Sequence, residues 1–382
     1  MSIRKYDVII VGAGPAGCSC ALGLKDSNLS VLLIDKSTFP RDKVCGDLIS
    51  ARSIKLLHSI DPETAVNFKK IPSLTHIMKT KGFHNEKMFF HIGWKSGAYI
   101  CKRKEFDNFL LNSVKSRTNI EVLEDFKVDH FKRNSNSIIV GNKEKDIFFE
   151  TKLVIGGDGA RSSIAKHTGH RKHKRDMYVA LRSYVTNVNE ISHDTNEVYT
   201  HKRLMPGPGY FWIFPLSDNS ANIGYGTTTS NIKKNKLNLK KYMNDLIKKS
   251  DIISNKLNNG NFDKIYSGII PIRTSRSAIS GERYMLIGDA ASLVDPISGG
   301  GIENAILSGI IAAKTIKEAF IVNNFTRSYL KTYDKELYRK IGINYYLRTS
   351  FIKLCTKLPG IYSMTIKLAR LFNINKLIST RI

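Results

Sequence analysis

Short apolar runs and helical periodicity predict how the chain begins. Tyr6 to Val11 is apolar and rich in β-branched residues, which is typical of a buried strand. Ala16 to Lys25 has the pattern of a helix, and Leu29 to Ile34 that of a second strand. This order predicts a βαβ unit with parallel strands. Because the first apolar run is short and leads directly into this unit, we interpret it as mature structure and not as a signal peptide.

The rest of the pattern alternates between sheet and helix. Apolar residues at helical spacing predict a helix over Phe106 to Ser116. Strands are expected at 120–140, 147–155, 178–225 and 266–271, a lysine-rich helix at 237–256, and helices from 302 to the end with a break at Pro359-Gly360. The sequence has no internal repeat and no low-complexity linker, so we expect these parts to pack together.

A glycine-rich turn at residues 12–17 joins the first strand to the first helix. Gly12 allows the tight turn, Gly14 lets the backbone approach a pyrophosphate, and Gly17 lets the helix pack close to the strand. The start of the helix offers free N–H groups and the positive end of a dipole. Asp35 ends the second strand, where a carboxylate can accept hydrogen bonds from ribose hydroxyls. The unit predicts a dinucleotide site and leaves NAD(P) and FAD both open.

Two later glycine turns also follow apolar strands. One is Gly156-Gly157-Asp158-Gly159, and the other begins at Gly288-Asp289 and continues to Gly299-Gly300-Gly301 before a helix. Asp289 suits an acceptor for ribityl hydroxyls. The glycine backbone at the helix start suits a donor to a pyrimidine carbonyl and stabilises negative charge near flavin N1. Taken alone, each turn can equally be interpreted as a surface turn with an aspartate cap. Three such turns in one chain favour a flavin.

The three turns resemble the fingerprints of the flavoprotein family that includes p-hydroxybenzoate hydroxylase, over roughly residues 5 to 310. The resemblance implies an α/β fold in which a Rossmann-like domain binds extended FAD and carries an inserted β-sheet substrate domain. It implies an FAD-binding domain of residues 1–70, 101–175 and 272–330, a substrate-binding domain of 71–100 and 176–271, and a basic helical C-terminal segment of 331–382.

The same resemblance implies a set of cofactor-binding residues and no metal site. Arg103 matches the family's arginine that precedes a helix and contacts the cofactor. The alternative is one more exposed arginine in a basic chain. The implied cofactor-binding residues are Gly12, Gly14, Ala16, Gly17, Asp35, Lys36, Cys45, Gly46, Arg103, Asp158, Gly159, Gly288, Asp289, Pro296, Gly299, Gly300, Gly301 and Ile302.

One segment resembles the geranylgeranyl reductases within this family. Phe39 to Asp47 contains Lys-Val-Cys-Gly-Asp, similar to the family's K-x-C-G-G, with Asp47 in place of the second glycine. By this resemblance Cys45 lies near the isoalloxazine ring, where a thiol can gate the substrate or hold a proton. The alternative is a buried structural cysteine.

A second segment, Pro208 to Pro215, resembles the P-x-x-Y-x-W-x-F-P motif of the same reductases, although Gly207 stands where a strict match has proline. Alternation along a strand places every second side chain on one face. The alternative to a pocket wall is an ordinary core strand, where aromatic residues are common. With the resemblance we expect a wall for an isoprenoid chain, made of Tyr210, Trp212, Phe214 and Pro215.

The resemblance implies reduction of isoprenoid C=C bonds in a lipid or prenyl substrate by hydride from reduced FAD, with NAD(P)H or another reductant as the electron donor. An isolated alkene also needs a proton, for which Cys45, Tyr210 or an ordered water are candidates. One alternative is an FAD-dependent aromatic monooxygenase or halogenase, although the chain has no W-x-W-x-I-P segment. Another is a lipid-binding module with a vestigial flavin site.

Charge adds a prediction about partners. The chain has 60 Lys and Arg against 33 Asp and Glu, a net charge of +27, without a nucleic-acid-binding motif. After Glu336 it carries nine basic residues and no acidic one, interleaved with apolar residues. Such a segment predicts peripheral contact with an anionic membrane, and the alternative is a helical cap with a solvated cationic face.

The composition of the chain indicates the cellular compartment in which the protein functions. With 42% hydrophobic residues the chain has the composition of a globular protein, and it has no apolar run of about 20 residues. Its five scattered cysteines predict free thiols and a reducing compartment. We therefore expect a cytoplasmic protein, peripheral to the inner face of the membrane.

Overall fold

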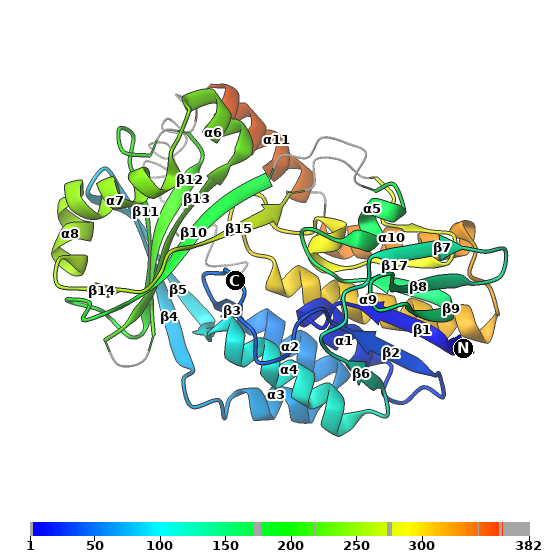
Figure 1. The fold of residues 1–382 in the computed structure, drawn as a ribbon. Coiled ribbons are helices and arrows are strands. Elements are labelled where there is room, and N and C mark those ends of the chain that lie inside the picture. Colours follow the sequence, from blue (N-terminus) through cyan, green and yellow to red (C-terminus); the bar gives the residue numbers. More distant parts are fainter. Residues whose placement is uncertain are drawn as a thin grey trace.

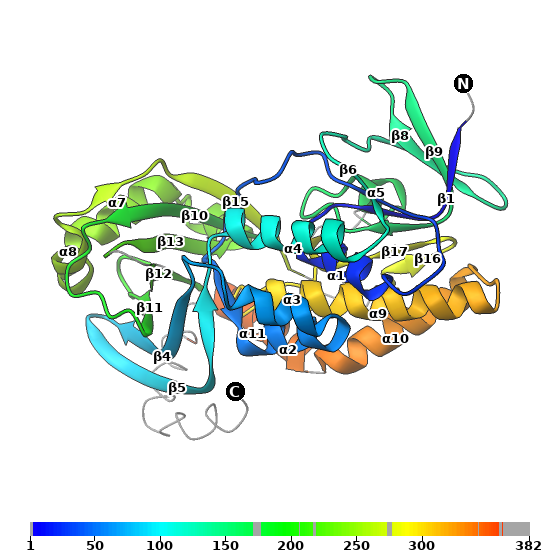
Figure 2. The ribbon, with the colours of Figure 1, turned by 90° about the horizontal axis from the view of Figure 1, so that it is seen from below.

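The computed structural model describes residues 3–170, 177–205, 207–216, 219–272, 277–342, 344–358 and 361. Within them, two sheets lie side by side, and helices pack around both (Figures 1 and 2). The first sheet has the order β16-β17-β9-β1-β2-β6, and a ribbon of β7 and β8 continues from β9. Its strands are β1 (Arg4–Val11), β2 (Val31–Ile34), β6 (Glu121–Leu123), β7 (His130–Arg133), β8 (Ile138–Asn142), β9 (Ile147–Gly156), β16 (Ser280–Gly281) and β17 (Tyr284–Leu286).

The centre of the first sheet is parallel, as the βαβ pattern predicts. β1 pairs in parallel with both β2 and β9, and β9 pairs in parallel with β17. Parallel strands are covered on both faces, which explains why the apolar runs are nearly continuous. The helices of this half are α1 (Pro15–Gly23), α2 (Ala51–Ile60), α3 (Pro62–Phe68), α4 (Arg103–Arg117), α5 (Ser163–His167), the short 3₁₀ helix η1 (Gly288–Ala291), α9 (Ile302–Ile321) and α10 (Arg327–Ile341).

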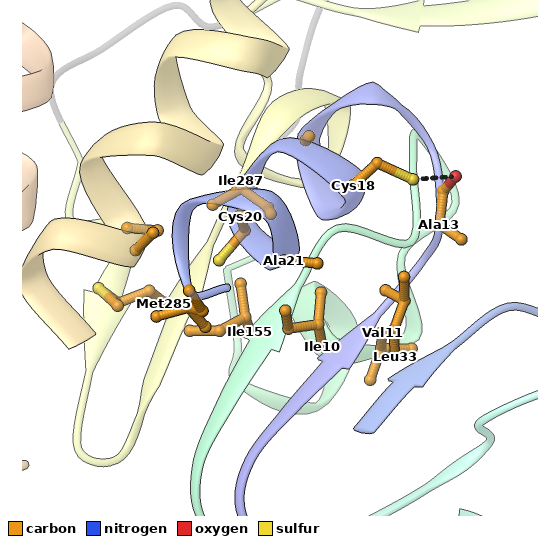
Figure 3. Close-up of a cluster of buried hydrophobic side chains, with 14 of the residues drawn as sticks. Ile10, Val11, Ala13, Cys18, Cys20, Ala21, Leu33, Ile155, Met285 and Ile287 are labelled. Carbon is orange, nitrogen blue, oxygen red and sulfur yellow. Dashed lines mark hydrogen bonds between the residues drawn. The ribbon is translucent and has the colours of Figure 1, made fainter. Parts of the chain in front are cut away.

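Helix α1 lies in the core of this half. Figure 3 shows Cys20 and Ala21 of α1 above Ile10 and Ile155 of the sheet, and all four side chains are fully buried. On another side α1 meets α9 at very close range, because a Cβ atom on Gly309 would lie 2.3 Å from the Ala16 carbonyl oxygen. Small residues therefore fix the two helices that begin at the first and third glycine turns.

The second sheet is mostly antiparallel, with the order β14-β10-β13-β12-β11-β4-β5-β3 and with β15 beside β10. The β11–β4 pair is parallel. Its strands are β3 (Leu48–Ser50), β4 (Thr75–His84), β5 (Lys87–Ile100), β10 (Met177–Thr186), β11 (Thr195–Thr200), β12 (Gly209–Pro215), β13 (Ala221–Thr228), β14 (Asn261–Phe262) and β15 (Tyr266–Pro271).

Helices cover one face of the second sheet. They are α6 (Thr229–Asn235), α7 (Leu239–Lys249) and α8 (Asp251–Leu257). Phe211 and Ile213 of β12 pack in one buried cluster with Met243 of α7 and Ile253 of α8. The single helix expected at 237–256 is thus wrong in one respect: the chain breaks at Ser250, whose side chain accepts from Ile253 N–H and starts a second helix.

Beyond α10 the structure describes one more helix, α11 (Asn344–Lys357). Residues 362–382, which hold the last four of the nine basic residues, lie outside the described part of the chain. None of the described helices is both long and apolar enough to cross a membrane. In the described residues no three His, Cys, Asp or Glu side chains gather as a metal site. All five cysteines are free.

Candidate active site

The first glycine turn brings three backbone segments into close contact. Gly12 has a φ of +107°, and a Cβ atom there would lie 2.3 Å from the Gly157 carbonyl oxygen. A Cβ atom on Gly17 would lie 1.8 Å from the Gly12 carbonyl oxygen. The turn therefore joins β1, α1 and the second glycine turn, and side chains at these positions would separate them.

Two of the helices that begin without a capping side chain start at a glycine. Among the described helices, seven begin with a side chain that accepts from the first turn: Ser50, Asp61, Ser162, Thr228, Asn238, Ser250 and Thr326. In contrast, α1 begins at Gly14 and α9 at Gly301, and neither has a side-chain cap. Uncapped N–H groups at a glycine are available to an anionic or carbonyl ligand. This fits the diphosphate and the pyrimidine ring of FAD.

The predicted ribose acceptor, Asp35, is already held by the backbone. It is 7% exposed, and its two carboxylate oxygens accept from Ala13 N–H at 2.8 Å and from Ser37 N–H at 2.9 Å. These bonds orient the carboxylate beside the first glycine turn and leave each oxygen a further lone pair for a ribose hydroxyl. Lys36 next to it is exposed.

At the second turn, the Asp158 carboxylate accepts hydrogen bonds from the protein backbone. Its Oδ2 accepts from the N–H groups of Ser163 and Ile164 at the start of α5. Its Oδ1 is buried and has no hydrogen-bond partner in the described part of the chain. Gly159 follows with a φ of +79°. The carboxylate thus caps one helix with one oxygen and has the other available for a ligand.

The third turn is shaped by charged side chains. Asp289 accepts from Lys43 Nζ at 2.7 Å. Asp295 accepts from the N–H groups of Ile297 and Ser298, so it holds the bend that leads to Gly299. Gly288 and Gly299 have φ values of +56° and +68°. The Pro296 carbonyl accepts from the Tyr178 hydroxyl at 2.6 Å and ties this turn to the second sheet.

A pocket lies where this turn faces the second sheet. Cys45, Gly46 and Arg103 line it together with Asp289, Gly299, Gly301 and Ile302 from the third turn. Tyr210, Trp212 and Phe214 line it from β12, on the face opposite Phe211 and Ile213. Pro215 ends the strand and is not among the lining residues. The pocket therefore has cofactor-type turns on one side and an apolar aromatic wall on the other.

Arg103 is buried in the wall of this pocket as part of a charged cluster. It is 3% exposed, and it donates from Nε and from Nη2 to the two oxygens of Asp107, both at 2.7 Å. Arg41 donates to the same carboxylate at 2.9 Å. Although burial raises the pKa of Asp107, these two arginines lower it below its usual range. Arg41 also lies 3.9 Å from the Asp35 carboxylate, so this charged cluster links the pocket to the first glycine turn.

Cys45 lies on the pocket as a neutral thiol. Burial raises its pKa, and the neighbouring Arg103 guanidinium offsets only part of this. A Cβ atom on Gly46 would lie 3.0 Å from the Phe214 ring, so only glycine lets the cysteine loop pack this tightly on the aromatic wall. Tyr210 donates its hydroxyl proton to the Ser298 carbonyl, and burial raises its pKa well above the ordinary value.

A buried hydrogen-bond network behind the pocket was not predicted from the sequence. Asn222 of β13 donates to the Cys45 carbonyl at 2.8 Å and to Asp47 Oδ2 at 2.7 Å, and it accepts from Trp212 Nε1 at 2.9 Å. Tyr184 of β10 donates to the same Asp47 oxygen at 2.8 Å. One amide thus fixes the cysteine loop and the indole ring relative to each other. The only signal in the sequence is Asp47 itself, which stands where the reductase motif has glycine.

Asp47 is fully buried, and its backbone has a φ of +64°. Its Oδ1 has no hydrogen-bond partner among the described residues. Burial raises the pKa of Asp47 from 3.8 to about 6, although the hydrogen bonds from Tyr184 and Asn222 lower it in part. The site therefore holds a carboxyl group that changes its charge just below neutral pH.

This fold and these three converging turns define the class of FAD-dependent oxidoreductases with a p-hydroxybenzoate hydroxylase-like architecture. Residues 5–339 match the FAD binding domain family. The chain is 30% identical to a digeranylgeranylglycerophospholipid reductase of Methanosarcina mazei, over 82% of this chain and 76% of the relative. It is 29% identical to a menaquinone reductase of Mycobacterium tuberculosis, over 81% and 76% of the two chains. The protein belongs to the geranylgeranyl reductase family of FAD-dependent oxidoreductases.

Solved structures share the fold. A geranylgeranyl bacteriochlorophyll reductase-like protein of Thermoplasma acidophilum superposes with a TM-score of 0.78, covering 92% of this chain and 88% of that one at 23% identity. Flavin-dependent halogenases also have this fold, at 15 to 19% identity, and one of them was solved with FAD. At these identities the likeness concerns the fold alone, and the sequence relatives carry the assignment to the reductases.

Proposed function

We propose that the protein saturates isoprenoid C=C bonds of a lipid or prenyl substrate. The observation that carries this proposal is the apolar wall of Tyr210, Trp212 and Phe214 directly across the pocket from the third glycine turn. An aromatic, largely apolar wall suits a hydrocarbon chain and offers little to a polar aromatic substrate. The names of the sequence relatives support the same class of substrate.

Residues of this chain bind FAD and donate the proton that the reaction needs. The N–H groups at Gly14 and Gly301 and the cation Arg103 hold FAD, together with the other predicted residues of the three turns. When bound and reduced, FAD supplies the hydride for one alkene carbon. Cys45 gives the proton to the other carbon, because its thiol is neutral and borders the pocket. The Tyr210 proton is instead engaged with the Ser298 carbonyl.

We also propose a function for each part of the chain. Residues 1–70, 101–175 and 272–330 bind FAD, and residues 71–100 and 176–271 bind the substrate. The basic C-terminal segment 331–382 contacts an anionic membrane from the cytoplasmic side. NAD(P)H or an equivalent reductant restores the reduced flavin.

Anaerobic reoxidation tests the proposed reaction. The FAD-loaded protein, once reduced, is expected to recover its oxidised flavin spectrum when a geranylgeranyl lipid in detergent is added without oxygen. Mass spectrometry should then show the lipid heavier in steps of two hydrogens. Prompt peroxide formation or hydroxylation of an aromatic compound under air, without any change in the lipid, would instead identify a monooxygenase. A purified protein that retains no flavin would leave only a lipid-binding role.

Replacing Cys45 with alanine tests the proton donor. We expect the rate of lipid-dependent reoxidation to fall by about 100-fold or more, because the alkene loses its proton source. Cys45→Ser should recover part of the rate, and Tyr210→Phe should retain most of it. FAD content measured from absorbance should stay unchanged in all three variants. A larger loss in Tyr210→Phe than in Cys45→Ala would reverse the assignment.

A further inference from the structure

Helix α11 presents a row of apolar side chains to solvent. Leu347, Leu354 and Leu358 are 64%, 43% and 54% exposed, and the partly buried Phe351 lies between them. Leu358 directly follows the helix, and its N–H still donates to the Leu354 carbonyl at 2.8 Å. Their spacing of four, three and four residues places all four on one face of a helix. Single exposed leucines are ordinary, but a row of three on one face indicates a surface that binds a partner.

The opposite face holds α11 against the flavin half. The hydroxyl of Tyr345, which is buried, lies 2.7 Å from the Val294 carbonyl oxygen and 3.0 Å from that of Ser292. Arg348 forms an ion pair with Asp295, the residue that holds the third turn. Val294 itself lines the pocket. The helix that displays the leucines is therefore fixed to the wall of the candidate active site.

The other end of α11 reaches the second sheet's half. Lys234 of α6 donates from Nζ to the Lys357 carbonyl at 2.9 Å, and Figure 1 shows α11 beside α6. The helix thus spans from the third glycine turn to α6, across the two halves between which the pocket lies. The helix therefore contacts the pocket wall with one face and presents the leucines on the other.

Positive charge flanks the leucine row. Lys353 and Lys357, both exposed, lie on one side of it, and Arg348, which pairs with Asp295, lies on the other. The chain has no acidic residue after Glu336. Leucines bordered by cations fit the interface of an anionic bilayer, where the apolar face is immersed and the cations meet the headgroups. A second copy of the chain would instead oppose like charges across the interface.

We infer that the leucine face of α11 lies in the surface of an anionic lipid bilayer and brings the pocket to the substrate lipid. This inference rests on the proposed function, because it names the surface that makes the proposed membrane contact and takes the substrate from that proposal. The contact itself needs no flavin chemistry. A helix that lies in the interface reaches about 5–10 Å into the headgroup region, so it needs no membrane-spanning segment.

Sedimentation with vesicles tests the contact. The full-length FAD-loaded protein is mixed with vesicles of phosphatidylcholine, with or without phosphatidylglycerol. It should sediment with the anionic vesicles only, and less in high salt. The variant Leu347→Ser/Leu354→Ser should bind these vesicles about tenfold more weakly, or worse. The matched control is Ile321→Ser/Val322→Ser at the end of α9, two residues that are 83% and 55% exposed, and it should bind like the wild type.

Several results would overturn the inference. One is a wild type that stays in solution with both kinds of vesicle. Another is a leucine variant that binds vesicles as well as the wild type does. A third is a leucine variant that differs from the wild type only in its oligomeric state, which would identify a second copy of the chain as the partner of the leucine face. A fourth is a leucine variant with a lower melting temperature and unchanged vesicle binding, which would show that another part of the chain covers the row.

An activity comparison separates this inference from the proposed function. The leucine variant should reduce a detergent-dispersed geranylgeranyl lipid at the wild-type rate and the same lipid in anionic vesicles about tenfold more slowly. If the wild type reduces neither, the proposed function fails while the sedimentation result stands. If the variant and the wild type reduced the lipid in vesicles at equal rates, α11 would have no role in lipid delivery.

Discussion

Alanine at Gly12 is expected to give a protein that retains no FAD and unfolds at much lower urea concentration. The added Cβ atom would lie 2.3 Å from the Gly157 carbonyl oxygen and 2.8 Å from Asp158 N, and neither backbone atom can rotate away. The φ of +107° adds strain for any residue with a side chain. Together these cost about 3 kcal/mol or more, a large share of the roughly 5–15 kcal/mol that stabilises a typical protein. Flavin absorbance and urea denaturation measure the two effects.

Gly14→Ala is the matched control, because it changes the same turn without the clash. Gly14 has a φ of −76°, and the nearest atom to an added Cβ is Arg41 Nη2 at 3.7 Å. Without FAD, the variant should unfold at the urea midpoint of the wild-type apoprotein. It should nevertheless bind FAD about tenfold more weakly or worse, since the methyl group stands where the pyrophosphate approaches the helix start. Wild-type FAD affinity in this variant would show that the phosphates lie elsewhere.

The parts of the site that follow from the sequence are those set by a few neighbouring residues. The turn at 12–17 needs only a strand, a helix and glycines at fixed positions, and the structure has all three. Alternation along one strand likewise places Tyr210, Trp212 and Phe214 on the pocket face of β12. Such signals are local, so they do not depend on how distant segments meet.

The parts that could not be predicted depend on contacts between distant segments. Asn222 is 175 residues from Asp47, and nothing around it marks it as the centre of a network. The break at Ser250 was also missed, because apolar periodicity continues on both sides of it and only the cap shows where the second helix begins. The prediction for Asp158 stays open, since the structure shows it capping α5 and leaves one oxygen for a ligand.

Replacing Asp47 with asparagine should remove a pH dependence of stability. The folded state binds the Asp47 proton more tightly than the unfolded state, because the pKa is raised from 3.8 to about 6. The resulting stabilisation is complete below about pH 4 and is lost as the pH rises through 6. We expect the free energy of unfolding of Asp47→Asn, relative to the wild type, to rise by roughly 2 kcal/mol between about pH 4 and pH 7. Urea denaturation of both proteins across this range measures the difference.

Asp146→Asn is the control for this experiment. Asp146 also has a left-handed backbone, with a φ of 50°, but it is exposed. This variant measures the effect of the same replacement on a left-handed backbone at an exposed position, so the contribution of left-handed strain can be separated from the Asp47 result. Asparagine at 47 keeps an oxygen that accepts from Tyr184 and Asn222, and the indole of Trp212 should stay in place. A constant difference for Asp47→Asn would mean that Asp47 titrates alike in the folded and unfolded chain. Burial would then not govern its charge, and the polar network behind the pocket would be open to water.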